Sequence, residues 1–278
     1  MRYAIISDIH SNLQALHSAL NCIEQENVDE IICLGDIVGY NANPIECIDI
    51  VKNHPKIKHI VQGNHDETVT RFDNIPFSEQ KEWSRDASDG LEYSHRLLDD
   101  NDIQWLKSHP EKMVINDPKL PFLISHHSPF GVSLDWGYIL NWDHANYALM
   151  ELKNNKKYKS EKIKLAFFGH SHVPTVAYTI EGGKNIYLNM GNVVCEVPIK
   201  IKKNIYYIIN SGAIGQPRNK GFTTYAIFDT DKMMVNVKPF EYDIKGAQEA
   251  IRKAKYRDPD AIVRLAKRLE PDIPKNKT

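Results

Sequence analysis

The chain has 278 residues, a formal net charge of −1 and a sequence pI near 6.9. This balance gives no general electrostatic attraction to an anionic membrane, and no basic stripe with interleaved aromatic residues predicts a groove for extended nucleic acid. No apolar run approaches the roughly 20 residues of a membrane span, and residues 1–30 lack the pattern of a signal peptide. The four cysteines include no C-x-x-C pair, so we expect free thiols in a cytoplasmic protein.

The first third of the chain alternates short apolar runs with amphipathic segments. Residues 3–6, 31–34 and 57–61 are rich in Ile, Val and Leu and are bounded by Gly or polar residues, which predicts buried strands. Asn12 precedes a segment whose apolar residues share one helical face, and Pro44 opens a second predicted helix. This alternation favours parallel strands with helices packed on the sheet.

A long insertion at about residues 67–110 precedes the next predicted strand at residues 122–124. The apolar spacing from Ala87 to Leu98 predicts one helix, and a shorter helix is expected near Ile103. Because the insertion separates two groups of candidate site residues, it is placed to overhang the site as a cap. A peripheral helical pair on the sheet edge is the alternative.

Beyond residue 172 the pattern becomes rich in short β-segments. Six segments, separated by Gly or charged turns, predict a second sheet stacked on the first: residues 173–180, 185–188, 195–201, 205–209, 223–228 and 233–240. Gly182 and Gly183 predict a hairpin between the first two. Near the C-terminus, Asp258 and Pro259 open a further predicted helix.

Residues that bind divalent metals follow five of the predicted strands. Ligands gather beyond the carboxyl ends of strands in sheets of this kind, so we expect these residues to converge. Within two of the groups the residues are two positions apart, so on an extended backbone both side chains project to one side. Three carboxylate or amide oxygens and four imidazoles suffice for two cations, with Asp36 as the natural bridge. The seven residues are Asp8, His10, Asp36, Asn64, His126, His170 and His172.

In chain order these residues form the blocks D-x-H, G-D, G-N-H-D, a lone H and G-H-S-H. The set resembles the calcineurin-like metallophosphoesterases, and N-S-G-A-I-G-Q-P-R at residues 210–218 is similar to a segment of their small prokaryotic branch. The resemblance implies an α+β fold: a four-layer α/β/β/α sandwich in which two stacked mixed β-sheets are flanked by helices. We expect the catalytic domain at residues 1–241 and a C-terminal helical extension, residues 242–278, packed on it.

The resemblance also implies a role for each ligand. One metal would be held by Asp8, His10, Asp36 and His172, and the other by Asp36, Asn64, His126 and His170. His65 would be the catalytic proton donor to a leaving group displaced in line by a metal-bridging hydroxide. Mixed His and Asp ligands suit manganese, iron, zinc, nickel or cobalt, so the identity of the two divalent cations stays open.

Three further residues are candidates for substrate binding. His127 adjoins His126, and only one of the two can face the metals from an extended segment; the resemblance selects His126. Arg218 could grip a phosphate oxygen with its two-pronged guanidinium, or pair with an acid on a loop. Asn210 lies with Gly212 in the turn that brings this loop to the site, and Gly212 is a candidate for positive φ.

One departure from the pattern concerns the support of His65. Serine/threonine phosphatases and symmetrical diadenosine tetraphosphatases have G-D-x-V-D-R-G, with a second Asp behind the catalytic His. Here Gly39 and Tyr40 replace that Asp and Arg. A close relationship to those enzymes is therefore doubtful, and the group that orients His65 is left open.

These residues predict a metal-dependent phosphoesterase acting on a phosphomonoester or a small phosphodiester. Two alternative enzyme functions are a protein serine/threonine phosphatase and a dinucleotide polyphosphate hydrolase. The substrate would accordingly be a phosphorylated small molecule or a phosphoprotein. From another class, a non-catalytic metal-binding scaffold would use the same face to bind partners. The intact ligand set with His65 beside it favours catalysis, since a scaffold has no chemical need for a proton donor.

Overall fold

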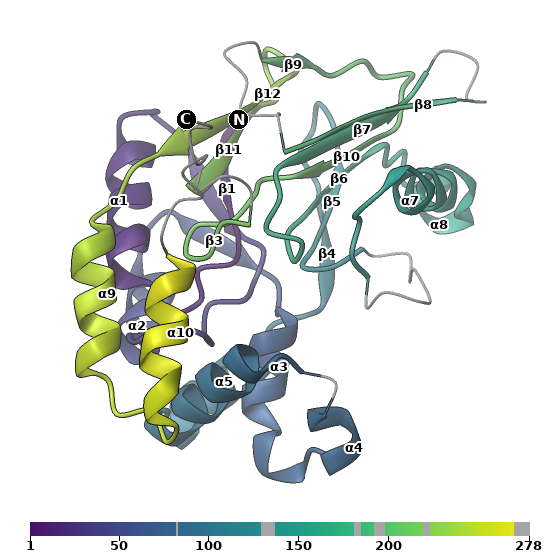
Figure 1. Ribbon diagram of the computed structural model, residues 1–278. Coiled ribbons are helices and arrows are strands. Elements are labelled where there is room, and N and C mark those ends of the chain that lie inside the picture. Colours follow the sequence, from purple (N-terminus) through teal and green to yellow (C-terminus); the bar gives the residue numbers. More distant parts are fainter. Residues whose placement is uncertain (82, 129–136, 181–184, 192–197, 219–222, 270–278) are drawn as a thin grey trace, which may run out of the picture.

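Two six-stranded β-sheets, each with parallel and antiparallel pairs, are stacked face to face (Figure 1). The computed structural model describes residues 1–81, 83–128, 137–180, 185–191, 198–218 and 223–269. In spatial order, the first sheet contains β3 (Ile57–Ile60), β2 (Glu30–Cys33), β1 (Arg2–Ile6), β11 (Thr223–Asp229), β12 (Met234–Phe240) and β9 (Ile199–Lys200). The second contains β4 (Lys112–Ile115), β5 (Phe122–Ser125), β6 (Leu165–Phe168), β10 (Tyr207–Asn210), β7 (Thr175–Thr179) and β8 (Ile186–Met190).

The predicted strands at residues 3–6 and 31–34 have no charged residue because both faces of β1 and β2 are buried there. In β1, Tyr3 and Ile5 point into the core between the sheets, while Ala4 and Ile6 pack against helices. Strand β6 shows the same alternation, with Phe167 facing the other sheet and its neighbours facing the outer helices. A strand covered on both faces needs no polar alternation, which explains the unbroken pattern in the sequence.

Helices cover the outer face of each sheet and complete four layers (Figure 1). The first sheet is covered by α1 (Leu13–Glu24) and α2 (Pro44–Asn53), and the second by α7 (Trp142–Asn154) with α8 (Lys156–Ser160). Asn12 caps α1, since its side chain accepts from the backbone N–H of Ala15 at 3.1 Å. The predicted α+β sandwich of two mixed sheets flanked by helices is confirmed.

The prediction that the six segments after residue 172 form the second sheet is wrong for three of them. Strand β11 pairs antiparallel with β1 and joins the first sheet, together with β12 and β9, whereas β10 lies between β6 and β7 in the second. Periodicity reports that a segment is buried, but not which distant strand it pairs with. The Gly182-Gly183 hairpin and the start of the predicted strand at 195–201 lie outside the described residues.

The insertion and the C-terminal residues form a helical group beside the first sheet. It contains α3 (Asn64–Thr70), the 3-10 helix η1 (Phe72–Asn74), α4 (Phe77–Gln80), α5 (Arg85–Leu97), α6 (Asp100–Lys107), α9 (Ile244–Lys253) and α10 (Pro259–Arg268). Helix α10 packs on α5, where Arg264 Nε lies 2.8 Å from Asp86 Oδ1. Among the described residues, no helix combines the length and apolar character needed to cross a bilayer.

Candidate metal centre

The loops that follow parallel strands of both sheets meet at one edge of the sandwich. The backbone N–H of Asp8 donates to Gly35 O at 3.0 Å, which joins the loops after β1 and β2. The N–H of His170, after β6 of the other sheet, donates to Asp8 Oδ2 at 3.1 Å. These bonds bring side chains that are more than 100 residues apart in sequence to one place, as expected for ligands beyond strand carboxyl ends.

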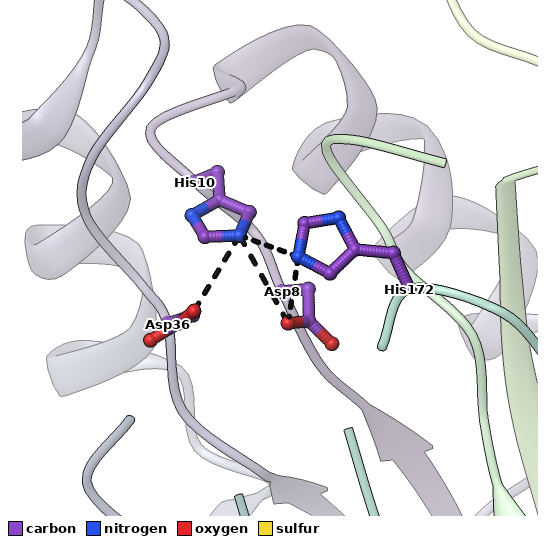
Figure 2. Close-up of side chains that lie close together, drawn as sticks. All are labelled: Asp8, His10, Asp36 and His172. Carbon is purple, nitrogen blue, oxygen red and sulfur yellow. Dashed lines mark hydrogen bonds and ion pairs between the residues drawn. The ribbon is translucent and has the colours of Figure 1, made fainter. Parts of the chain in front are cut away.

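Two groups of ligand atoms lie at this edge, and they share Asp36. In each group the candidate atoms lie within 4.8 Å of one another and the side chains are buried. One group is Asp8, His10, Asp36 and His172 (Figure 2), and the other is Asp36, His126 and His170. Asn64 lies beside the second group, because its Oδ1 is 3.1 Å from His126 Nε2. All seven predicted ligands are therefore brought together.

Backbone carbonyls fix the direction of three imidazoles. The Nδ1 atoms of His10, His126 and His172 each lie 2.6–3.1 Å from a carbonyl oxygen. A carbonyl can only accept a hydrogen bond, so Nδ1 carries a proton in each ring. Each Nε2 is then presented to the centre of the cluster, an arrangement that is usual for metal-bound histidines.

Two of these Nε2 atoms face each other with no proton between them. His10 Nε2 lies 3.0 Å from His172 Nε2, and burial lowers the pKa of both rings, so both are neutral at pH 7. Two facing lone pairs repel, and a cation is the partner that satisfies both. His126 differs from these two histidines. Burial lowers the pKa of its ring, but Asp36 has the larger, opposite effect and raises the pKa to about 9. The ring therefore holds a proton that a bound metal would replace. This donor set fits divalent metals.

Five of the seven predicted ligands have a left-handed backbone. Few non-glycine residues adopt positive φ, and each instance costs on the order of 1–3 kcal/mol, so such residues concentrate at functional sites. The sequence predicted an extended backbone for the pairs Asp8/His10 and His170/His172. This prediction is wrong, because the spacing of residues in the sequence does not reveal φ. Tight turns, not a strand, direct the two side chains of each pair to the same place. The φ values are 55° for Asp8, 48° for His10, 52° for Asp36, 65° for His170 and 58° for His172.

Asp36 faces both groups of ligands. Its Oδ2 lies 3.2 Å from His126 Nε2 and 3.5 Å from His10 Nε2, while its Oδ1 accepts from the N–H of His65 at 2.8 Å. Burial alone raises the pKa of this carboxyl, but the neighbouring imidazoles, His126 first, outweigh burial and hold the pKa well below its usual range. An ionised carboxylate thus lies between the two groups.

Asp66, the last residue of the G-N-H-D block, joins two of the loops that carry ligands. Its Oδ1 accepts from the backbone N–H groups of Ile37 and Val38 at 2.8 and 3.2 Å, and its Oδ2 accepts from Gly63 at 3.0 Å. The side chain is buried. Asp66 therefore positions the loops that carry Asp36 and the start of α3.

Aromatic rings pack around the His65 side chain. The centroid of its ring lies 4.8 Å from that of Tyr40 and 4.7 Å from that of His10. Gly39 stands where related phosphatases have their second Asp, and a Cβ there would lie only 2.4 Å from His65 Nδ1. Burial lowers the pKa of His65 to about 4, against the opposing effect of Asp36.

A cavity of about 700 Å³ opens beside His65 and the second group of ligands. His127 lines this cavity, whereas the buried His126 belongs to the second group of ligand atoms, in agreement with what the resemblance implied. Arg218 also lines it, with its guanidinium 5.9 Å from the centre of the Tyr138 ring. Within the described part of the chain Arg218 forms no ion pair with a carboxylate, so the alternative of a loop salt bridge gains no support.

A family model described as the calcineurin-like phosphoesterase superfamily domain matches residues 1–233. The chain belongs to this superfamily. An uncharacterized protein of Methanocaldococcus jannaschii is 32% identical over 256 residues, which are 90% of this chain and 91% of that protein. The crystal structure of a metallophosphoesterase from Sphaerobacter thermophilus is similar with a TM-score of 0.71 and 30% identity, covering 96% of this chain and 99% of that one.

A more partial similarity concerns a symmetrical bis(5′-nucleosyl)-tetraphosphatase of Actinobacillus pleuropneumoniae. It is 26% identical over 137 residues, which are 48% of this chain and 46% of that enzyme. The likeness to the tetraphosphatase is therefore limited to about half of each chain. The family model over residues 1–233 confirms the calcineurin-like family that the motifs predicted.

Asn210 was predicted to contact the substrate, but its position in this calcineurin-like protein does not fit that role. It is fully buried, and its Nδ2 donates to Gly169 O at 2.5 Å and to Ser171 Oγ at 2.9 Å. Its Oδ1 accepts from the N–H of Gly212 at 2.7 Å, and Gly212 has the positive φ expected of it, 78°. We infer that Asn210 holds the loop bearing the last two histidines, because it has no surface to offer a substrate.

Two tyrosines near the centre were missed by the sequence reasoning. Tyr40 packs on His65, and its carbonyl accepts from Tyr256 OH at 2.9 Å, so the segment between α9 and α10 supports it. Tyr138 stacks on His170 with ring centroids 3.8 Å apart. Tyr40 could have been noticed because it lies four residues after Asp36, where the phosphatase pattern has an arginine, whereas no motif surrounds Tyr138.

Proposed function

We propose that the chain is a binuclear metal-dependent phosphoesterase that hydrolyses a phosphomonoester or a small phosphodiester. The observation that carries the proposal is the pair of buried ligand groups that share Asp36, next to a cavity. When bound, two divalent cations would lower the pKa of water and neutralise charge on the phosphate. Manganese, iron, zinc, nickel and cobalt all suit these donors. Asp8, His10, Asp36 and His172 would hold one cation, and Asp36, Asn64, His126 and His170 the other.

Three residues of the chain would act on the substrate itself. Arg218 would bind a non-bridging phosphate oxygen through charge-assisted hydrogen bonds, and His127, which lines the same cavity, would contact the substrate. His65 would give a proton to the leaving oxygen. Burial lowers the pKa of His65 to about 4, which favours the neutral ring. The negative charge of a phosphate bound beside the ring would act in the opposite direction and favour its protonated form.

The insertion at residues 67–110 would cap the site. Arg71, which follows α3, and Ala87 and Leu91 of α5 line the same cavity as Arg218 and His170. A peripheral helical pair would not contribute side chains to this cavity.

We also propose that residues 242–278 are an extension packed on a catalytic domain of residues 1–241. The extension would support the site through the hydrogen bond from Tyr256 to the carbonyl of Tyr40.

Dinucleotide polyphosphate hydrolysis is the second candidate, because of the partial similarity to the tetraphosphatase. Both candidates predict activity, so the first test is release of nitrophenolate from p-nitrophenyl phosphate and from its bis ester. The chelator-treated protein should be inactive and should regain turnover when manganese is added. No turnover with any of the five metals would contradict the proposal and favour a non-catalytic metal-binding scaffold.

A further inference from the structure

The lining of the cavity combines two kinds of residue. Asn64, His65, His170 and Arg218 belong to the candidate site or lie beside it, whereas Trp83, Ala87 and Leu91 come from the helical insertion. A volume of about 700 Å³ is much larger than one phosphate needs and is within the range of small-molecule sites. The cavity therefore has room for the group that the phosphate esterifies as well as for the phosphate.

Of the two arginines that line the cavity, Arg218 is the one suited to bind a phosphate. Arg71 also lines the cavity, but its Nε bonds Glu67 Oε1 at 2.5 Å, and its two other nitrogens bond both oxygens of Glu79 at 3.2 and 2.5 Å. Two carboxylates thus occupy the hydrogen-bonding edge of this guanidinium. Arg218, in contrast, lies against the Tyr138 ring and forms no carboxylate ion pair with a described residue.

Apart from Arg218, the cavity is lined by more carboxylates than cations. Three glutamates, Glu67, Glu79 and Glu111, line it together with Arg71 and Lys112. Once Arg218 has bound the reacting phosphate, a second phosphate would meet this excess of like charge, and repulsion of this kind discriminates between ligands. The N-terminus of α5, which also reaches the cavity, is already capped, because the side chain of Ser84 accepts from the N–H of Ala87 at 3.2 Å.

Apolar and aromatic side chains form another part of the lining. Trp83, Ala87 and Leu91 come from the insertion, and Tyr40 from the loop after β2. The Trp83 ring is held in place by Phe72, with centroids 6.2 Å apart. Flat rigid rings of this kind bind other flat rings by stacking and by burial of apolar area.

We propose that this cavity binds the alcohol side of the substrate as an uncharged aromatic ring system and excludes a second phosphate group. The inference rests on the proposed phosphoesterase function and names the class of substrate: a phosphoester of a neutral aromatic alcohol. Trp83 is the specificity-determining residue, and Glu111 contributes to the exclusion of anions. A dinucleotide polyphosphate, whose further phosphates would meet the glutamates of the cavity, is therefore disfavoured as a substrate.

The test compares 2-naphthyl phosphate with the same ester carrying a sulfonate on the outer ring, with p-nitrophenyl phosphate as the reference. The two naphthyl esters have the same shape, and the sulfonate makes the leaving group more acidic, so chemistry alone would favour the sulfonated ester. We expect the opposite order, with kcat/KM for the neutral ester higher by about tenfold. Equal values, or a preference for the sulfonated ester, would overturn the inference.

Substitutions test whether Trp83 and Glu111 cause the preference for the neutral ester. Trp83→Ala should lower kcat/KM for 2-naphthyl phosphate about tenfold and reduce its ratio to p-nitrophenyl phosphate, while Trp83→Phe should retain most of the ratio. Glu111→Gln should raise kcat/KM for the sulfonated ester about twofold to fivefold. The matched control is Trp142→Ala on the exposed start of α7, which should change neither ratio.

The outcomes separate this inference from the proposed function. Turnover of p-nitrophenyl phosphate with no dependence of the ratios on Trp83 or Glu111 would overturn the inference and leave the phosphoesterase intact. Absence of turnover for every ester with every metal would overturn both. Near-UV circular dichroism of each variant checks folding, and Trp83→Phe and Glu111→Gln keep the test decisive if Trp83→Ala does not fold.

Discussion

Asn210→Ala distinguishes a positioning role from the substrate contact that the sequence suggested. The substitution removes three buried hydrogen bonds, to Gly169 O, Ser171 Oγ and the Gly212 N–H. Each is worth about 1 kcal/mol net, and the orphaned N–H adds a further penalty, so we expect a loss of about 3–5 kcal/mol. In a chain of this size that corresponds to a fall in Tm of roughly 6–20 °C.

The measurement is urea unfolding of the chelator-treated protein, followed by metal titration of the folded variant. Metal affinity should fall too, because the Gly169–Ser171 turn carries His170 and precedes His172. Asn53→Ala is the matched control, since Asn53 is exposed and makes a single side-chain bond to Asp49 O; its free energy of unfolding should stay within about 0.5 kcal/mol of the parent. If Asn210→Ala instead raised KM with stability and metal affinity unchanged, the buried positioning role would be refuted.

Three further predictions concern the chemistry of the centre. His65→Ala should keep its metals and lose about 10²–10⁴-fold in kcat, with a smaller loss for esters whose leaving group is already acidic; equal losses for aryl and alkyl phosphates would count against proton donation. Arg218→Lys should lower kcat/KM by about 10- to 100-fold at unchanged metal content, because lysine cannot reproduce the bidentate contact; unaltered kinetics in Arg218→Ala would leave a structural arginine. Manganese affinity should rise about tenfold per pH unit from pH 7 and level off near pH 9, because a proton must leave His126, whose pKa burial lowers but Asp36 raises to about 9. Calorimetric titration at several pH values checks this, and a pH-independent affinity would contradict it.

Much of the centre could be predicted because its chemistry demands particular side chains at the ends of buried strands. Apolar runs identified strands covered on both faces, and metal-binding residues directly after them indicated convergence. The prediction of which histidine of the His126-His127 pair faces inward came from the resemblance, and burial agrees with it.

What could not be predicted depends on backbone angles and on contacts distant in sequence. The positive φ at Asp8 and His170 has no signature in the spacing, and the sheet that β11 joins is decided by its pairing with β1, more than 200 residues away. The group that orients His65 was left open because Tyr40 acts through its ring, and no motif of metal-binding or charged residues indicates such packing.

The central claim is that one carboxylate, Asp36, is shared by two cations, and the metal content of two variants tests it most directly. Elemental analysis of the parent protein, loaded with manganese and freed of excess metal, should give two ions per chain. Asp36→Ala should lose both ions, whereas Asp8→Ala should retain one, because Asp8 belongs to a single group of ligands. Retention of both ions in Asp36→Ala, with its fold intact by circular dichroism, would contradict the shared bridge.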